Sequence, residues 1–185
     1  MRLTLIMPKI PHNLSERFHT LHRGKKKLMY PSMTPYILAA LTPPDIEVEI
    51  VDENIDELNF EKKADLVGIS LSSTPVSPRV YEIAEEFRKR GSKVILGGIH
   101  ASIMPEEAIK HADSVFIGEA EPILDELIEK VKELKSPTKS IEEFADLDGI
   151  YIPKIHNSPK RVWIRDLDDA PHPLAQQIPL VDSRS

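Results

Sequence analysis

Three apolar segments of this sequence end in small or polar residues, at 70–74, 97–98 and 118–119. Residues of these types could contact a large ligand. Glycine lets a flat or bulky ligand approach the main chain closely, and hydroxyl side chains can donate hydrogen bonds to it. Three such ends in one sheet predict the floor of a site for a large cofactor rather than packing alone. The candidate cofactor contacts at these ends are Ser70, Ser72, Ser73, Thr74, Gly97, Gly98, Gly118 and Glu119.

Histidines and the residues after the first apolar segment extend this candidate site. His100 follows the two glycines directly, so it is weighed equally as a residue that faces the ligand and as a solvated loop histidine. Pro8, Lys9 and His12 follow the segment Leu3-Thr4-Leu5-Ile6-Met7 and are included as cofactor contacts, although His12 is not expected to bind a metal. The sequence names neither a catalytic residue nor a metal ligand.

Structural roles are open for the same residues. The hydroxyls of Ser70 to Thr74 could cap the following helix, and Thr74 is expected to do both. Gly97 and Gly98 could permit close packing of a helix on the sheet. The ligand role is preferred because the neighbouring strand ends are small as well.

Common occupants of such an edge can be tested by their motifs. A dinucleotide site needs Gly-x-Gly-x-x-Gly after the first strand, and Met7-Pro8-Lys9-Ile10-Pro11 has no glycine. A P-loop needs Gly-Lys-Ser or Gly-Lys-Thr opening a helix, whereas Gly24-Lys25-Lys26 neither ends in a hydroxyl residue nor adjoins a helix. Proline after the first strand also disfavours a flavin site, and the third strand lacks the terminal aspartate of a phosphorelay receiver.

Strands and helices alternate along the chain. Apolar runs predict strands at 3–7, 48–52, 65–70, 94–98 and 114–117. Helical spacing predicts helices at 35–41, 78–90, 105–109 and 121–134, the first capped by Thr34. This pattern predicts an α/β fold of the flavodoxin-like, Rossmann-like type, with a five-stranded parallel sheet covered by helices on both faces.

The segment after Ser136-Pro137 changes character. Residues 150–155 and 160–164 are predicted to form a C-terminal β-hairpin, and 165–173 an extended linker. We therefore expect a domain at 1–135 and a connector at 136–185, in a chain cut from a longer polypeptide.

Composition excludes several classes of protein. The net charge of −6 argues against nucleic-acid binding, which needs a basic face. The chain has no cysteine, which excludes disulfides, thiolate zinc and an iron–sulfur cluster bound by this chain. No apolar stretch is long enough for a membrane span or a secretory signal, so a cytoplasmic protein is expected.

A family resemblance rests on these strand ends taken in order. Ser70-Leu71-Ser72-Ser73-Thr74-Pro75 followed by Leu96-Gly97-Gly98 resembles the paired signature of cobalamin-binding domains of the methionine synthase type. Gly97-Gly98-Ile99-His100-Ala101-Ser102 and Gly118-Glu119-Ala120-Glu121-Pro122 resemble the N-terminal domain of cobalamin-dependent radical S-adenosylmethionine enzymes. The hairpin and Asp166-Leu167-Asp168-Asp169-Ala170-Pro171-His172-Pro173 are similar to the connector before their catalytic barrel.

The resemblance implies a chain that binds cobalamin with its lower nucleotide held in the protein and presents cobalt to a C-terminal barrel. The barrel is the expected partner, and it would supply S-adenosylmethionine and the [4Fe-4S] cluster; a methyltransferase is the expected activity. Two departures matter. Ile10-Pro11-His12-Asn13-Leu14 lacks the Asp-x-His-x-x-Gly motif whose histidine ligates cobalt, and the Cys-x-x-x-Cys-x-x-Cys motif is absent.

Two other functions stay open at this point. The chain could be a separate cobalamin or tetrapyrrole module with a carrier or sensing role. It could also be a Rossmann-like interaction domain without a cofactor. A cysteine triad encoded beyond Ser185 would favour the radical enzyme over both.

Overall fold

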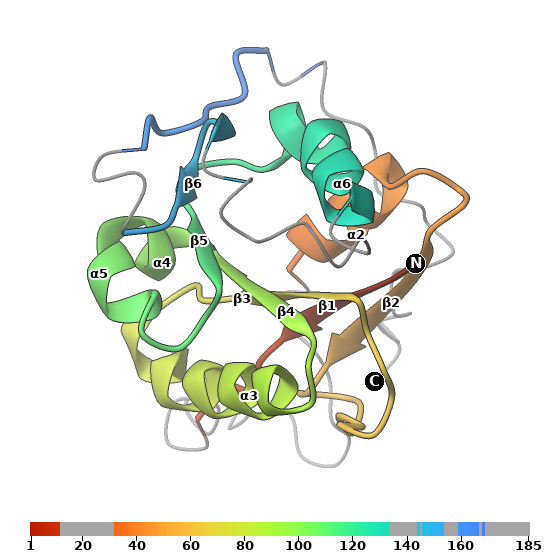
Figure 1. Ribbon diagram of the computed structural model, residues 1–185. Helices are drawn as coiled ribbons and strands as arrows, with labels where there is room; N and C mark the ends of the chain where they lie inside the picture. The colour runs from red at the N-terminus through yellow and green to blue at the C-terminus, as the bar shows by residue number, and fades with distance from the viewer. Residues whose placement is uncertain (12–31, 134–143, 145, 154–158, 167, 169–185) are drawn as a thin grey trace, which may run out of the picture.

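A six-stranded sheet forms the centre of the molecule, which we describe from a computed structural model (Figure 1). The structure describes residues 1–11, 32–133, 144, 146–153, 159–166 and 168. The strand order is β2-β1-β3-β4-β5-β6, and β1 to β5 pair in parallel. The strands are β1 (Arg2–Met7), β2 (Glu47–Asp52), β3 (Leu66–Ser70), β4 (Lys93–Gly97), β5 (Ser114–Phe116) and β6 (Ile150–Tyr151).

Helices cover both faces of this sheet, because its central strands are apolar on both sides. On one face lie α2 (Thr34–Leu41) and α6 (Leu124–Glu133), and on the other α3 (Ser77–Lys89), α4 (Ile99–Ile103) and α5 (Pro105–Ala108) (Figure 1). Two 3-10 turns, Thr74–Val76 and Glu121–Ile123, lead into α3 and α6. The order of the parallel strands reverses direction between β1 and β3, where ligands of open α/β sheets bind.

The two faces enclose separate apolar clusters. Successive strand residues point to opposite faces, so Val94 and Leu96 pack toward α3, while Ile95 packs toward α6. Ile83 and Phe87 of α3 fill the first cluster, and Leu127 and Ile128 of α6 belong to the second. The predicted α/β class with helices on both faces is confirmed.

The strand count differs from the prediction of five. β6 is a sixth strand that pairs antiparallel with β5, through Val115 with Tyr151 and Phe116 with Ile150. Within the described residues, the two arms of the predicted hairpin pair with the sheet and not with each other, since Val162 forms a bridge with Gly118. An isolated two-stranded hairpin is marginally stable, and pairing these arms with the sheet buries Ile150 and Val162.

Two smaller expectations also need comment. Thr34 is not the N-cap of α2 but its first residue, and Met33 stands in the cap position without a side-chain hydrogen bond. Phe144, Leu147 and Ile150 are buried in the cluster that α6 helps to form. The described parts of 136–185 thus share the core of the preceding residues, and the division at 135 stays a prediction. No helix within the described residues is both long and apolar enough to cross a bilayer.

Candidate functional site

A cavity of about 480 Å³ opens at the carboxyl edge of the sheet and extends between the sheet and the α2/α6 layer. Pro35 and Leu38 of α2, with Leu127 and Ile128 of α6, form its outer wall. The sheet forms the inner wall, which carries Leu3, Leu5, Leu66, Gly68, Ser70, Ile95, Gly97 and Phe116. Its volume lies in the range of small-molecule sites.

Ser70 and Gly97, on adjacent strands, leave the upper part of this inner wall without side-chain bulk. Gly68 lies one step lower, where the Cδ2 of Leu5 would be 3.1 Å from an added Cβ atom. Gly68 and Ser70, two residues apart on β3, both lie on the cavity face of the strand. Ser70 pairs with Gly97 of β4. A Cβ atom built on Gly97 would meet nothing closer than the Cβ of Phe116, at 3.8 Å. Among the described residues the space beside Gly97 is therefore open, and none of them gives a packing reason for glycine there.

Gly98 and Gly118 line the same cavity for a different reason. Both have positive φ angles, of 112° and 111°. A Cβ on Gly98 would lie 2.9 Å from the carbonyl oxygen of Leu71, and one on Gly118 would overlap the carbonyl oxygen of Val162. These two glycines allow the chain to pack on itself, so their structural role is present beside any contact with a ligand.

The predicted hydroxyls divide into two groups. Ser70 and Ser72 line the cavity, whereas Ser73 and Thr74 are exposed and are not among its wall residues. Thr74 instead places its Oγ1 3.1 Å from Nδ1 of His100. The hydroxyl of Thr74 therefore connects the loop after β3 to His100 of α4.

His100 does not line the cavity, although the residue before it does. His100 is 8% exposed, and its Nε2 lies 3.7 Å from Oε1 of Glu107 and has no hydrogen-bond partner among the described residues. Ile99, by contrast, is 67% exposed at the cavity mouth. The α4 turn thus directs Ile99 toward the mouth and His100 toward Thr74 and Glu107, away from a position that could ligate a metal in the cavity.

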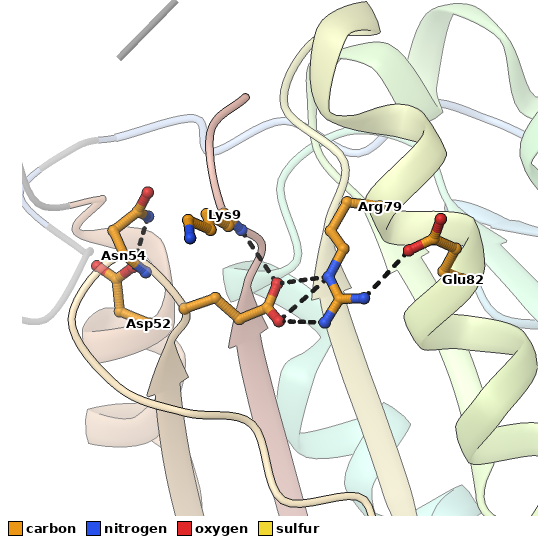
Figure 2. Close-up of polar contacts among 6 residues, drawn as sticks. Lys9, Asp52, Asn54, Arg79 and Glu82 are labelled. Carbon is orange, nitrogen blue, oxygen red and sulfur yellow. Dashed lines mark hydrogen bonds and ion pairs between the residues drawn. The ribbon is translucent and has the colours of Figure 1, made fainter. Parts of the chain in front are cut away.

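Lys9 is held beside the sheet edge by the turn after β2 (Figure 2). The backbone N–H of Lys9 donates to Oε2 of Glu53 at 3.1 Å. Glu53 is 7% exposed and pairs with Arg79 of α3, whose Nη2 lies 2.5 Å from Oε1. This hydrogen bond raises the pKa of the Arg79 guanidinium. Neither Pro8 nor Lys9 lines the cavity, and His12 lies outside the described residues.

Charged side chains gather at the cavity mouth. Glu119 lines the mouth, and its Oε2 accepts a hydrogen bond from the backbone N–H of Ile164 at 2.5 Å. Arg161 also lines the mouth, and its guanidinium lies 4.1 Å from the ring centre of Trp163. Arg161 forms no ion pair or hydrogen bond with another residue that the structure describes.

A family model, described as the B12 binding domain, matches residues 34–128, just over half of the chain. The chain belongs to the B12-binding domain family. The matched range contains Ser70, Gly97 and Gly118 and therefore most of the inner wall of the cavity.

Curated relatives of this B12-binding domain are methyltransferases. It is 48% identical over 96 residues to bacteriochlorophyllide d C-8(2)-methyltransferase of Chlorobaculum tepidum, which is 51% of this chain and 21% of that protein. The C-12(1)-methyltransferase of the same organism is 35% identical over 49% of this chain and 20% of its own length. An uncharacterised methyltransferase of Pyrococcus horikoshii is 25% identical over 77% of this chain and 33% of its own. The chain spans about a fifth to a third of the length of these relatives.

Two solved structures share its fold. The cobalamin-dependent S-adenosylmethionine radical enzyme OxsB, with aqua-cobalamin bound, superposes with a TM-score of 0.67 at 15% identity, covering 93% of this chain and 24% of that one. The radical S-adenosylmethionine methyltransferase TsrM of Kitasatospora setae, with cobalamin and a [4Fe-4S] cluster bound, gives 0.58 at 22% identity, covering 80% of this chain and 26% of that one. At these identities the likeness concerns the fold.

The residues of this B12-binding domain fit its cofactor. The cavity could take in the nucleotide tail of cobalamin but not the larger corrin ring, which would stay at the mouth. The open space beside Gly97 is what such a tail would fill. Within the described residues, no group of three or more His, Cys, Asp or Glu side chains could hold a bare metal ion.

Several wall residues were missed by the sequence reasoning. They include Gly68, Ser102, Arg161, the apolar residues of α2 and α6, and apolar strand residues such as Leu5 and Ile95. The alternation Leu66-x-Gly68-x-Ser70 could have indicated Gly68, because it places two small residues on one strand face. The fold alone brings Arg161 to the mouth, and its sequence position gives no signal. Ser102 accepts the backbone N–H of Gly118 at 3.1 Å and so joins α4 to the end of β5.

Proposed function

We propose that this B12-binding domain holds cobalamin for a radical S-adenosylmethionine methyltransferase, with the nucleotide tail inserted between the sheet and the α2/α6 layer. The observation that carries the proposal is the open space beside Gly97, which continues into an apolar cavity under the two helices. A packed α/β domain without a tail-binding cofactor would fill this space with side chains, because protein interiors are close-packed.

The proposed roles of the site residues follow from their depth. Gly97 and Ser70 flank the path of the tail, and Ser72 and Gly98 stand at the rim, where they can meet the ribose-phosphate or the corrin edge. Gly118 and Glu119 border the mouth on the β5 side. His100 joins α4 to the loop after β3 and is not proposed as a cobalt ligand. Ser73, Thr74, Pro8 and Lys9 keep only the outer role of shaping the loops around the corrin, and His12 stays a proposed cofactor contact outside the described residues.

The partner in this proposal is a catalytic barrel that belongs to the same polypeptide. Support comes from the methyltransferase relatives, of which this chain spans only a part. Exposed apolar side chains beside the mouth agree with a covering domain: Ile99, Ile103 and Trp163 are 67%, 65% and 58% exposed. The chain has no cysteine, so the ligands of a [4Fe-4S] cluster would come from the barrel, together with the S-adenosylmethionine site.

Bound cobalamin supplies a cobalt-centred methyl carrier, and the protein's part is to orient it and to exclude water. The apolar walls beneath the mouth exclude water from the tail, and the rim residues fix the direction in which the upper corrin face points. The division into a binding domain at 1–135 and a connector at 136–185, and the cytoplasmic location, belong to the same proposal.

Titration with hydroxocobalamin tests the binding step. The 185-residue chain should bind it, with a change in the visible corrin spectrum and quenching of Trp163, the only tryptophan. Gly97→Leu should weaken binding by about ten-fold or more, since its side chain occupies the tail space.

Gly97→Ala is the matched control, because its methyl group meets Phe116 only at an ordinary contact distance. It should bind more tightly than Gly97→Leu and unfold at the temperature of the parent or slightly above it. No spectral change with the parent chain would refute cobalamin binding. Equal affinity of parent and Gly97→Leu would refute the tail position while leaving corrin binding in place.

A further inference from the structure

The polar side chains of the cavity wall all lie near its mouth. Ser70 and Ser72 are at the carboxyl end of β3, Ser102 is in α4, and Ser32 and Thr34 are at the start of α2. In right-handed βαβ units each helix begins near the carboxyl edge of the sheet, so the start of α2 is at the rim as well. Polar recognition by side chains is therefore confined to the upper level of the cavity.

The described residues at the deep end of the cavity all have apolar side chains. Leu66 lies four residues below Ser70 on the same strand, which corresponds to a depth of about 13 Å. The side chains at this lower level come from three strands and from α6, and they are Leu3, Leu5, Leu66, Ile95, Leu127 and Ile128. None of them can donate or accept a hydrogen bond.

The main chain at the deep end of the cavity offers few free hydrogen-bonding groups. Leu5, Gly68 and Ile95 pair across three neighbouring parallel strands, so the N–H and C=O groups around Gly68 are engaged in the ladders on both sides of β3. Ser114 carries a buried hydroxyl without a hydrogen-bond partner, but it is not a wall residue of this cavity. A polar group that enters the deep end loses its water and gains no partner among the residues that the structure describes.

We propose that this cavity selects corrinoids by the chemistry of their lower base: it accepts benzimidazole and phenolic bases and discriminates against purines. The inference rests on the proposed function, since it concerns the tail of the same cofactor. A phenolic base has no ring nitrogen, and benzimidazole, with its cobalt-binding nitrogen released, brings one unpaired acceptor. Adenine adds further ring nitrogens and an exocyclic amine, each of which loses hydrogen bonds to water on entry.

Four corrinoids test the selection on the 185-residue chain: hydroxocobalamin, a p-cresolyl cobamide, an adeninyl cobamide and cobinamide, which lacks the nucleotide. The readout is the quenching of Trp163 during titration. The cresolyl and benzimidazolyl forms should bind with similar affinity. The adeninyl form should bind roughly ten- to a hundred-fold more weakly, because unsatisfied polar groups are costly in an apolar site. Cobinamide should also bind more weakly than cobalamin.

A matched pair of variants isolates the effect that a polar group on the deep wall has on the selection of the lower base. Ile95→Thr and Ile95→Val give side chains of nearly equal shape, but only threonine brings a hydroxyl to the deep wall. Ile95→Thr should narrow the ratio between cobalamin and the adeninyl cobamide by several-fold, and Ile95→Val should leave it unchanged. Both variants keep the rim residues that meet the rest of the cofactor.

The outcomes separate this inference from the function on which it rests. No binding of any of the four corrinoids would refute the proposed function itself. Binding of all four with equal affinity would leave corrin binding in place but overturn the selection by the lower base. Discrimination against the adeninyl form that is the same in Ile95→Thr and Ile95→Val would overturn the assignment of the deep wall as its cause.

Discussion

The two faces of the sheet are built from the same strands but differ in how they are filled. On the face toward α3, residues such as Val67, Val94 and Leu96 are completely buried and meet the apolar side chains of the helix. On the face toward α2 and α6, the same strands present Gly68 and Gly97, and a cavity remains between sheet and helices. The face toward α3 is fully packed and stabilises the fold, whereas the face toward α2 and α6 is less tightly packed and leaves room for a binding site.

The difference arises from single alternating positions. Neighbouring residues on a strand point to opposite faces, so β4 presents Leu96 to the closed face and Ile95 and Gly97 to the open one. A fold of this kind can therefore carry a tail cavity without weakening the opposite layer, because each face is set by every second residue.

The largest expected effect comes from truncation on the closed face. Leu96→Ala removes side-chain contacts on all sides and should lower the free energy of unfolding by about 2–5 kcal/mol. Ile95→Ala, one residue earlier, borders the cavity and loses contacts on fewer sides. Its cost should be at the lower end, about 2 kcal/mol. Urea unfolding of both variants without cofactor measures the difference, and equal losses would contradict the distinction between the two faces.

The architecture could be predicted from the sequence because its signals are local. Apolar runs such as Leu3–Met7 and the helical spacing around Ile83 and Phe87 each indicate an element by themselves. The sixth strand could not be predicted in this way. Ile150 and Tyr151 have the pattern of any short strand, and only the exposed edge of β5 decides with which partner they pair.

The site was predicted in part for a similar reason. The strand ends at Ser70, Gly97 and Gly118 could be found because parallel strands bring their carboxyl ends to one edge. The deep walls could not be found, since the apolar strand and helix residues that form them look like ordinary core. His100 was proposed to face the ligand because it follows the glycines at 97 and 98. The direction of its side chain depends on the geometry of the α4 turn, which points it toward Thr74.

The two adjacent glycines of β4 and α4 sharpen the comparison at a smaller scale. Gly98→Ala should destabilise the protein by about 1–3 kcal/mol, because the φ angle of 112° is strained for alanine and its Cβ would lie 2.9 Å from a backbone oxygen. Gly97→Ala should be neutral or stabilise by up to about 1 kcal/mol, because its φ angle is not positive and its Cβ is unobstructed. Thermal unfolding of both variants is the measurement. A loss of stability in Gly97→Ala equal to that in Gly98→Ala would show that Gly97 is also needed for the fold.

The smallest expected change in stability comes from removing one polar contact between α3 and α5, on the closed face of the sheet. The hydroxyl of Tyr81 donates to Oε1 of Glu107 at 2.7 Å. This hydrogen bond is the main reason why the pKa of Glu107 lies below its ordinary value of 4.5, with His100 adding to the shift. Burial and the same carboxylate raise the pKa of Tyr81, so its hydroxyl stays a donor throughout the acidic and neutral range.

The sign of the pH dependence follows from the lowered pKa of Glu107. Its contribution to stability is complete above the unfolded-state pKa and disappears as the pH falls through the folded-state value. Tyr81→Phe keeps the ring, which stacks on His111 at 4.0 Å, and removes only the hydroxyl. The variant should therefore be less stable than the parent at pH 7, and the gap should narrow below about pH 4.5. Urea midpoints at pH 7 and pH 3.5 measure the gap, and a difference that does not change with pH would assign the loss to packing, making this contact equivalent to the apolar ones around it.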